Sequence, residues 1–243
     1  MDTNPRVALV TGANKGIGLE IARQLAQAGV FVIIGARHIG RANAAVADLA
    51  AQGLVSEPLL VDLNDLEGMP QAARAIEDKY GRLDILVNNA GIVDPDDGAP
   101  SAGMPEAARR IMDTNFIGTL AVTQAMLPLL RTSQAARIVN VSSSLGSLTL
   151  NGDPDSPYYA VRLIGYNASK AALNMLTVQL AAELRDTNIV VNSVSPGYVA
   201  TDLNGHSGPM SVQDGARLPV KYALLGDDAV SGRFVEPDGS TPW

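Results

Sequence analysis

The sequence predicts an α/β fold, a doubly wound parallel sheet of the Rossmann type with helices on both faces. Short, fully apolar runs rich in β-branched residues alternate with stretches that carry apolar residues at helical spacing. A glycine-rich turn follows the first apolar run, at the place where such a sheet holds a nucleotide. No repeat, low-complexity tract or linker divides the 243 residues, so we expect residues 1–243 to form a single domain.

Strands and helices are expected in alternation along the chain. The apolar runs that predict strands are Val7–Val10, Val30–Ile34, Val55–Val61, Leu83–Val87, Arg137–Val141 and Ile189–Val194. The stretches that predict helices are Ile17–Ala28, Arg41–Ala51, Met69–Tyr80, Pro105–Leu130 and Tyr166–Arg185. Gly29 and Gly81 follow two of these helices, where a helix often ends in a left-handed residue. Right-handed crossovers then bring the ligand crevice to the carboxyl ends of the strands.

Two segments do not fit this alternation. Ser147–Gly165 is rich in turn residues and precedes the last expected helix, and Leu203–Ala216, rich in Gly, Ser and Pro, follows the sixth strand. We expect both to be irregular and to lie at the crevice as substrate walls or lids. The alternative is that each is an ordinary surface connection.

Charge and residue types argue against several classes of protein. A net charge of −7, a pI near 4.8 and the lack of a basic run argue against a nucleic-acid partner. There is no cysteine, and His38 and His206 are far apart, so no metal site is expected. The first residues lack the pattern of a signal peptide, and no apolar run reaches 18 residues. We therefore expect no membrane association, a cytoplasmic location and a small-molecule partner.

The glycine-rich turn has the spacing GxxxGxG, formed by Gly12, Gly16 and Gly18. It lies between the strand Val7–Val10 and the helix Ile17–Ala28, which is the context that nucleotide binding demands. Such a turn lets the backbone approach a pyrophosphate, and the helix N-terminus favours its negative charge. The alternative is a merely structural loop.

The end of the second strand indicates which dinucleotide is bound. A carboxylate there would bond the adenosine ribose of NAD and repel the 2′-phosphate of NADP. The chain instead has Gly35-Ala36-Arg37, and Lys15 lies inside the glycine turn. Two cations that converge on that pocket favour NADP, since arginine binds phosphate bidentately. The alternative is that Arg37 is a solvated surface residue.

Tyr166 and Lys170 are spaced four residues apart where a long helix is expected to begin. This spacing places the phenol and the ammonium group on one helix face. The ammonium group would favour phenolate and so lower the pKa of the tyrosine from about 10. A tyrosine tuned in this way beside a nucleotide site suggests hydride transfer to or from a carbonyl group.

Taken together, these motifs resemble those of the short-chain dehydrogenase/reductase family over nearly the whole chain. The matching motifs are Thr11–Gly18, Val61-Asp62-Leu63, Asn88-Asn89-Ala90-Gly91, Asn115, Ser143, Tyr166, Lys170, and Pro196-Gly197 with Thr201. The resemblance implies that Ser143 holds the carbonyl oxygen and that Tyr166 donates the proton. It also implies that Lys170 bonds the nicotinamide ribose and that Asn115 anchors a water that links Lys170 to solvent.

The motifs and the resemblance together give the expected cofactor residues, which are Gly12, Asn14, Lys15, Gly16, Ile17, Gly18, Arg37, Asp62, Leu63, Asn89, Ala90, Gly91, Tyr166, Lys170, Pro196, Gly197, Val199 and Thr201. The substrate is expected to contact Ser143 and Tyr166. From their position beside the nicotinamide site and their apolar or aromatic character, Leu150, Tyr198 and Leu203 are expected to contact it as well. Among three adjacent serines, Ser143 lies three residues before Gly146 as the family alignment requires, and strand alternation points Ser142 and Ser144 the other way.

Within the family, Asn14–Gly18 and Pro242-Trp243 are most similar to the carbonyl reductase and salutaridine reductase branch. This branch uses NADPH to reduce ketones or aldehydes, so the resemblance implies a reversible, NADPH-dependent carbonyl reduction. The segment between Ser143 and Tyr166 is shorter than the helical insertion that blocks dimerisation in the archetypes of the branch, so monomer and homo-oligomer both stay open. The alternatives are an NAD-dependent alcohol dehydrogenase and a non-catalytic dinucleotide-binding protein.

Overall fold

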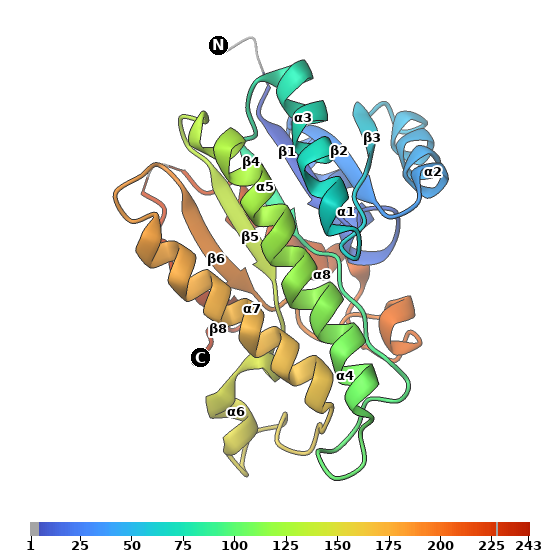
Figure 1. The fold of residues 1–243 in the computed structure, drawn as a ribbon, viewed down its shortest axis with the longest axis vertical. Helices are drawn as coiled ribbons and strands as arrows, with labels where there is room; N and C mark the ends of the chain where they lie inside the picture. Colours follow the sequence, from blue (N-terminus) through green and yellow to red (C-terminus); the bar gives the residue numbers. More distant parts are fainter. Residues whose placement is uncertain (1–4, 227) are drawn as a thin grey trace.

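The computed structural model describes residues 5–226 and 228–243 and is built on one eight-stranded sheet (Figure 1). The strands are β1 (Val7–Thr11), β2 (Phe31–Ala36), β3 (Ser56–Leu60), β4 (Ile85–Asn88), β5 (Arg137–Val141), β6 (Val190–Val194), β7 (Phe234–Glu236) and β8 (Gly239–Ser240). Their order is β3-β2-β1-β4-β5-β6-β7-β8, and every neighbouring pair is parallel except β7 and β8. The sheet grows in both directions from the β1–β4 boundary, which confirms the predicted doubly wound fold.

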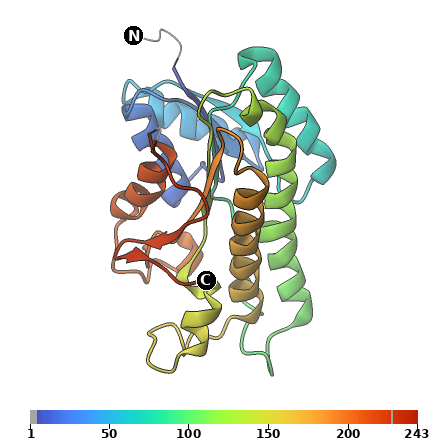
Figure 2. The same cartoon turned by 90° about the vertical axis from the view of Figure 1, so that its left-hand side faces the viewer.

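Helices cover both faces of the sheet. They are α1 (Gly16–Gln27), α2 (Ile39–Ala50), α3 (Met69–Tyr80), α4 (Pro105–Met112), α5 (Thr119–Arg131), α6 (Leu148–Gly152), α7 (Ile164–Glu183) and α8 (Val212–Ala223). Buried side chains of α1, α2 and α8 form one apolar core with the sheet, and those of α3, α5 and α7 form a second. Figure 2 shows the sheet between these two helix layers. Within residues 5–226 and 228–243, no helix combines the length and the apolar character needed to cross a bilayer.

The strand β1 shows why apolar residues follow one another without alternation in this sheet. Val7 and Leu9 belong to one apolar core, while Ala8 and Val10 belong to the other, and all four are buried. Successive side chains of a strand point to opposite faces, so a strand covered on both faces favours apolar residues at successive positions. This is the pattern from which the sequence predicts a parallel sheet.

Two predicted turn glycines have the expected conformation. Gly29 has a φ of 82° after α1, and Gly81 has a φ of 67° after α3. This left-handed region costs other residues free energy, which is why glycine ends these helices.

The stretch Pro105–Leu130 is not the single α-helix that its apolar spacing predicts. A π-helical turn over Asp113–Gly118 separates α4 from α5. In that turn Asn115 forms two hydrogen bonds with the backbone of Ile92. A Cβ on Gly118 would come within 2.2 Å of a backbone carbonyl in the loop after β3. These long-range contacts hold the wider turn, and helical periodicity alone does not reveal them.

Both segments expected to be irregular contain helix. Leu203–Ala216 includes the start of α8, which the Ser211 side chain caps, and Ser147–Gly165 includes α6. Gly215 and Pro219 inside α8 hide its helical pattern in the sequence. The strands β7 and β8 were not expected, because runs of three and two residues carry too little periodicity to be detected.

Candidate active site

The carboxyl ends of the parallel strands gather the predicted site residues at one edge of the sheet. The glycine turn follows β1, Arg37 follows β2, and Asp62 follows β3. Asn89–Gly91 follows β4, Ser143 follows β5, and Pro196-Gly197 follows β6. In open α/β sheets this edge forms the ligand crevice. The fold therefore brings together motifs that lie far apart in the sequence.

Gly12 and Gly18 of the glycine turn pack directly on neighbouring backbone and on Asn89, which leaves no room for a side chain at either position. Gly12 has a φ of 64°, and a Cβ on it would lie 2.9 Å from the Cα of Ala90. A Cβ on Gly18 would lie 2.4 Å from Asn89 Nδ2, which itself donates a 2.9 Å hydrogen bond to the carbonyl of Thr11. No side chain caps the N-terminus of α1. Its first N–H groups can therefore bind an anion, and this glycine-lined cradle fits a pyrophosphate.

Lys15 makes its ion pair across the crevice. Its ammonium group lies 2.6 Å from Asp202, in the loop after β6, and both side chains are more than half exposed. Hydrogen bonds from Lys15 and then from His206 lower the pKa of Asp202. Arg37 is exposed directly after β2. The sequence predicts that Lys15 and Arg37 converge on one phosphate pocket. In the structure, the Lys15 ammonium group is instead paired with the Asp202 carboxylate.

Tyr166 and Lys170 lie one turn apart at the start of α7. Lys170 Nζ is 5.6 Å from the centre of the Tyr166 ring, as expected for residues on one helix face. The same Nζ donates a 2.8 Å hydrogen bond to the carbonyl oxygen of Val141, at the end of β5. The Ser143 side chain lies close enough to Tyr166 to lower the pKa of its hydroxyl. The end of β5 and the first turns of α7 therefore form one polar centre.

Burial controls the pKa of both titratable groups in this centre. It raises the pKa of the Tyr166 hydroxyl to about 12, and the nearby Ser143 side chain opposes this only in part. It lowers the pKa of the Lys170 ammonium group to about 8. The expectation that Lys170 makes Tyr166 more acidic is therefore wrong for this structure, because both groups lose solvation together and the ammonium group is directed to Val141.

Asn115 lies beside Lys170 and is held on both ends of its side chain. Its Oδ1 accepts a 2.8 Å hydrogen bond from the Ile92 amide, and its Nδ2 donates to the Ser169 hydroxyl at 3.0 Å. A Cβ on Gly91 would lie 3.3 Å from Asn115 Oδ1 and 3.7 Å from Lys170 Nζ. Gly91 thus lies against both polar groups, and a side chain there would crowd the Asn115 amide oxygen.

The three adjacent serines have different partners. Ser142 and Ser144 are buried, and their hydroxyls donate to Asn174 at 2.7 Å and to Glu236 at 2.5 Å. Ser143 is partly exposed, and its side chain lowers the pKa of the Tyr166 hydroxyl. Of the three serines, it is therefore the one whose hydroxyl is not committed to a buried side-chain partner in the described structure.

The predicted substrate contacts lie on the two segments that flank the crevice. Leu150 is half-buried in α6, while Tyr198 and Leu203, in the loop after β6, are 57 % and 42 % exposed. The Tyr198 hydroxyl is hydrogen-bonded to Ser207 of the same loop. Exposed apolar surface at these positions can contact an apolar ligand. In the described part of the chain, no cluster of three or more His, Asp or Glu side chains could hold a metal ion.

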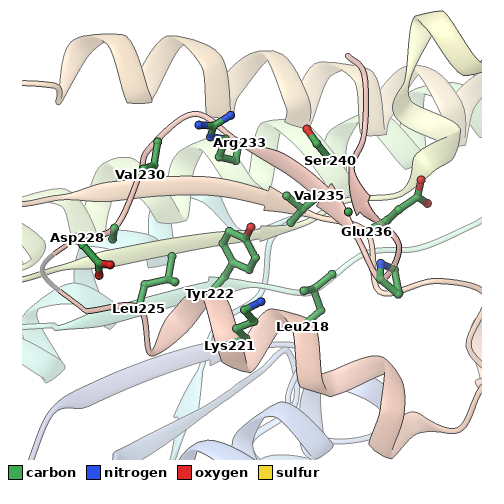
Figure 3. A pocket seen from close by; sticks show the side chains of 13 residues that line it. Leu218, Lys221, Tyr222, Leu225, Asp228, Val230, Arg233, Val235, Glu236 and Ser240 are labelled. Carbon is green, nitrogen blue, oxygen red and sulfur yellow. The ribbon is translucent and has the colours of Figure 1, made fainter.

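A cavity of about 450 Å³ lies apart from these residues, between α8 and the strands β7 and β8 (Figure 3). Apolar side chains of Leu218, Tyr222 and Val235 line it together with charged groups of both signs. None of the predicted site residues belongs to its lining. In Figure 3 the carboxylate of Glu236 points away from Tyr222, in keeping with its bond to Ser144.

Two carboxylates that no sequence motif marks are in contact with this centre. Asp97 accepts hydrogen bonds from the backbone amides of Gly165 and Tyr166, and Glu236 accepts one from Ser144. Their partners are 68 to 92 residues away in the sequence, so no local pattern could have found them.

Known proteins are similar to this chain in both sequence and fold. The family described as short chain dehydrogenase matches residues 6–211. Short-chain dehydrogenase anuI of Penicillium roqueforti (strain FM164) is 38 % identical over 245 residues, with 98 % of this chain and 96 % of that protein covered. Carbonyl reductase (NADPH) 1 of Sus scrofa is 34 % identical over 281 residues, with 100 % and 96 % covered.

A solved structure agrees with these relatives. Salutaridine reductase from Papaver somniferum superposes with a TM-score of 0.80 at 31 % identity, and 94 % of this chain and 99 % of that chain are covered. Family match, relatives and superposition all extend over most of the chain. The chain therefore belongs to the short-chain dehydrogenase/reductase family of oxidoreductases, close to its carbonyl reductase and salutaridine reductase branch.

Proposed function

We propose that this protein reduces a ketone or an aldehyde to an alcohol with NADPH, in a reaction that runs in both directions. The observation that carries the proposal is the polar centre of Ser143, Tyr166 and Lys170 at the crevice edge that also holds the glycine-lined cradle. Carbonyl reduction requires three groups from the protein: a hydrogen-bond donor for the carbonyl oxygen, a proton donor and a nearby cation.

Each side chain of this centre has a defined part in the reaction. Ser143 and Tyr166 bind the carbonyl oxygen, and NADPH, when bound, supplies the hydride that reduces the carbonyl carbon. The oxygen takes the proton of the Tyr166 hydroxyl, so that an alcohol and a phenolate result. Because burial raises the pKa of Tyr166 to about 12, the proton is in place before substrate arrives. Lys170 then offsets the phenolate charge and bonds the nicotinamide ribose, and Asn115 anchors a water that connects Lys170 to solvent.

The end of β2 supports NADPH over NADH. The strand ends in Gly35-Ala36 and is followed by Arg37, with no carboxylate to accept the ribose hydroxyls. An exposed guanidinium group at this place can bind the 2′-phosphate bidentately. The carbonyl reductase relative is named for NADPH as well. The residues that would hold the cofactor are Gly12, Asn14, Lys15, Gly16, Ile17, Gly18, Arg37, Asp62, Leu63, Asn89, Ala90, Gly91, Tyr166, Lys170, Pro196, Gly197, Val199 and Thr201.

The substrate is a small carbonyl compound that the two flanking segments recognise. Leu150, Tyr198 and Leu203 would contact its apolar part, while Ser143 and Tyr166 hold its oxygen. All of these positions are on elements of one continuous sheet and its connections, which supports a single domain.

A panel of small and bulky ketones and aldehydes tests the proposal, with NADPH or NADH oxidation followed by absorbance. We expect turnover with NADPH and a lower kcat/KM with NADH. Tyr166→Phe should keep NADPH binding and lose roughly 10²- to 10⁴-fold in kcat, the usual effect of removing a general acid. Wild-type turnover by this variant would contradict the mechanism, and wild-type preference for NADH would contradict the cofactor assignment.

A further inference from the structure

We propose that Asp97 is a positioning residue for the general acid, which it holds in place by capping the catalytic helix α7 from a separate loop. This inference rests on the function proposed above. Asp97 lies between β4 and α4. Its Oδ1 accepts a 2.8 Å hydrogen bond from the amide of Gly165, and its Oδ2 accepts a 2.9 Å bond from the amide of Tyr166 itself.

The helix α7 depends on this loop because it has no cap of its own. Its N-cap residue, Leu163, has no side chain that could accept the first-turn amides. The next amide, that of Ile164, donates to the carbonyl of Gly98 at 2.9 Å. Three successive amides of α7 are therefore bonded by two adjacent loop residues, Asp97 and Gly98. A carboxylate at a helix N-terminus also interacts favourably with the helix dipole.

The loop is itself fixed to the protein. The guanidinium group of Arg110, on α4, lies 2.8 Å from Asp94 and 3.7 Å from Asp96. The helix α4 also packs closely on the start of α7, where a Cβ on Gly165 would lie 2.8 Å from the Cα of Ala108. The backbone of the first turn of α7 is thus held on one side by α4 and at its end by the Asp97 carboxylate.

This contact matters for the reaction because Tyr166 has to place its hydroxyl within hydrogen-bond reach of the carbonyl oxygen. A misplacement of about 1 Å can cost roughly 100-fold in rate. The hydrogen bond from the Tyr166 amide to Asp97 fixes the backbone position from which the phenol projects. Asp97 accordingly acts through Tyr166 and not on the substrate.

Asp97→Ala and Asp97→Asn test this role, with Asp96→Asn as the matched control on the neighbouring carboxylate. We expect Asp97→Ala to lower kcat roughly 10- to 100-fold per NADPH-binding site, while the Kd for NADPH stays at its wild-type value. Asp97→Asn keeps one acceptor oxygen and should lose less. Asp96→Asn should stay close to wild type, because its exposed contact with Arg110 is long, at 3.7 Å, and Asp94 still holds the same guanidinium group at 2.8 Å. Expressing kcat per NADPH-binding site excludes any unfolded protein from the comparison. If Asp97→Ala does not fold, Asp97→Asn provides the test.

A double-mutant cycle with Tyr166→Phe separates positioning from general destabilisation. If Asp97 acts through the tyrosine hydroxyl, the double variant is no slower than Tyr166→Phe alone. The inference would be overturned if the losses in kcat of the two single variants multiplied in the double variant. A wild-type kcat for both Asp97→Ala and Asp97→Asn would overturn it as well. An active Tyr166→Phe enzyme would instead overturn the proposed general acid, so the two failures are distinguishable.

Discussion

The hydroxyl of Ser144 lies 2.5 Å from a carboxylate oxygen of Glu236, which joins the residue after Ser143 to the strand β7. The same oxygen accepts a hydrogen bond from the Tyr158 hydroxyl at 3.2 Å. Glu236 therefore connects the end of β5, the segment before α7 and the last part of the sheet. Hydrogen bonds to a charged group are about twice as strong as those between neutral groups.

We expect Glu236→Gln to lower the free energy of unfolding by about 1 kcal/mol, because the substitution keeps the shape but replaces a charge-assisted bond with a neutral one. Urea unfolding of the variant and the wild type measures this. Glu183→Gln, an exposed carboxylate at the far end of α7, is the matched control and should have little effect. Equal stability of Glu236→Gln and wild type would show that the charge of Glu236 contributes nothing to these contacts.

Arg37→Asp should shift the cofactor preference from NADPH toward NADH. The change removes a partner of the 2′-phosphate and introduces an acceptor for the ribose hydroxyls. The loss of one charge-assisted contact corresponds to roughly 10- to 150-fold in NADPH affinity. Titration with both cofactors measures the shift. Arg185→Asp makes the same charge change at an exposed position just after the C-terminal end of α7 and serves as the control. An unchanged preference would mean that Arg37 does not contact the cofactor.

The stability of the cofactor-free protein should rise with pH above about 8 because of Lys170. Burial lowers the pKa of this group to about 8 in the folded state, whereas an unfolded lysine has a pKa of about 10.4. Between these values the unfolded chain binds a proton that the folded protein has released, so the free energy of unfolding increases with pH. The complete gap corresponds to about 3 kcal/mol.

Denaturant unfolding at several pH values between 7 and 9.5 would measure this gain, and Lys170→Met, which lacks the titrating group, is the control. The range stops below 10 because the raised pKa of Tyr166 acts in the opposite direction above that pH: the unfolded tyrosine then loses its proton first. Parallel pH profiles for wild type and Lys170→Met would contradict the burial of a titrating amine at this site.

Leu150→Ala and Tyr198→Ala should change the order of preference among ketones and leave the KM for NADPH nearly unchanged. Both side chains lie on segments that flank the crevice, and both would contact the apolar part of the substrate. The measurement is kcat/KM over a series from small to bulky ketones. Val55→Ala removes an exposed apolar side chain just before β3 and serves as the control. The same order in all variants would place recognition elsewhere.

The fold could be predicted from the sequence, and so could the proximity of Tyr166 and Lys170 on one helix face. β5 begins and ends at Arg137 and Val141, as predicted, because the β-branched residues Ile138, Val139 and Val141 mark a strand that is covered on both faces. The glycine turn was equally readable, because close packing on Asn89 and Ala90 excludes every larger residue at Gly12 and Gly18.

What the sequence did not reveal depends on contacts between distant segments. The π-helical turn at Asn115 is held by the backbone of Ile92, and Asp97 meets α7 some 69 residues further on. The raised pKa of Tyr166 likewise depends on the depth of burial, which a spacing of four residues does not specify. Spacing predicts which groups are neighbours, and only the packed structure shows how much water they retain.

The ion pair between Lys15 and Asp202 has a kinetic consequence. It joins the turn after β1 to the loop after β6, and because β4 and β5 lie between those strands, it spans the mouth of the crevice. A dinucleotide laid along the strand ends has to part this contact on arrival and again on departure. Added salt weakens the ion pair between Lys15 and Asp202, yet it also screens the attraction of Arg37 for a phosphate. These opposing effects make the association rate less sensitive to ionic strength than the cations alone would suggest.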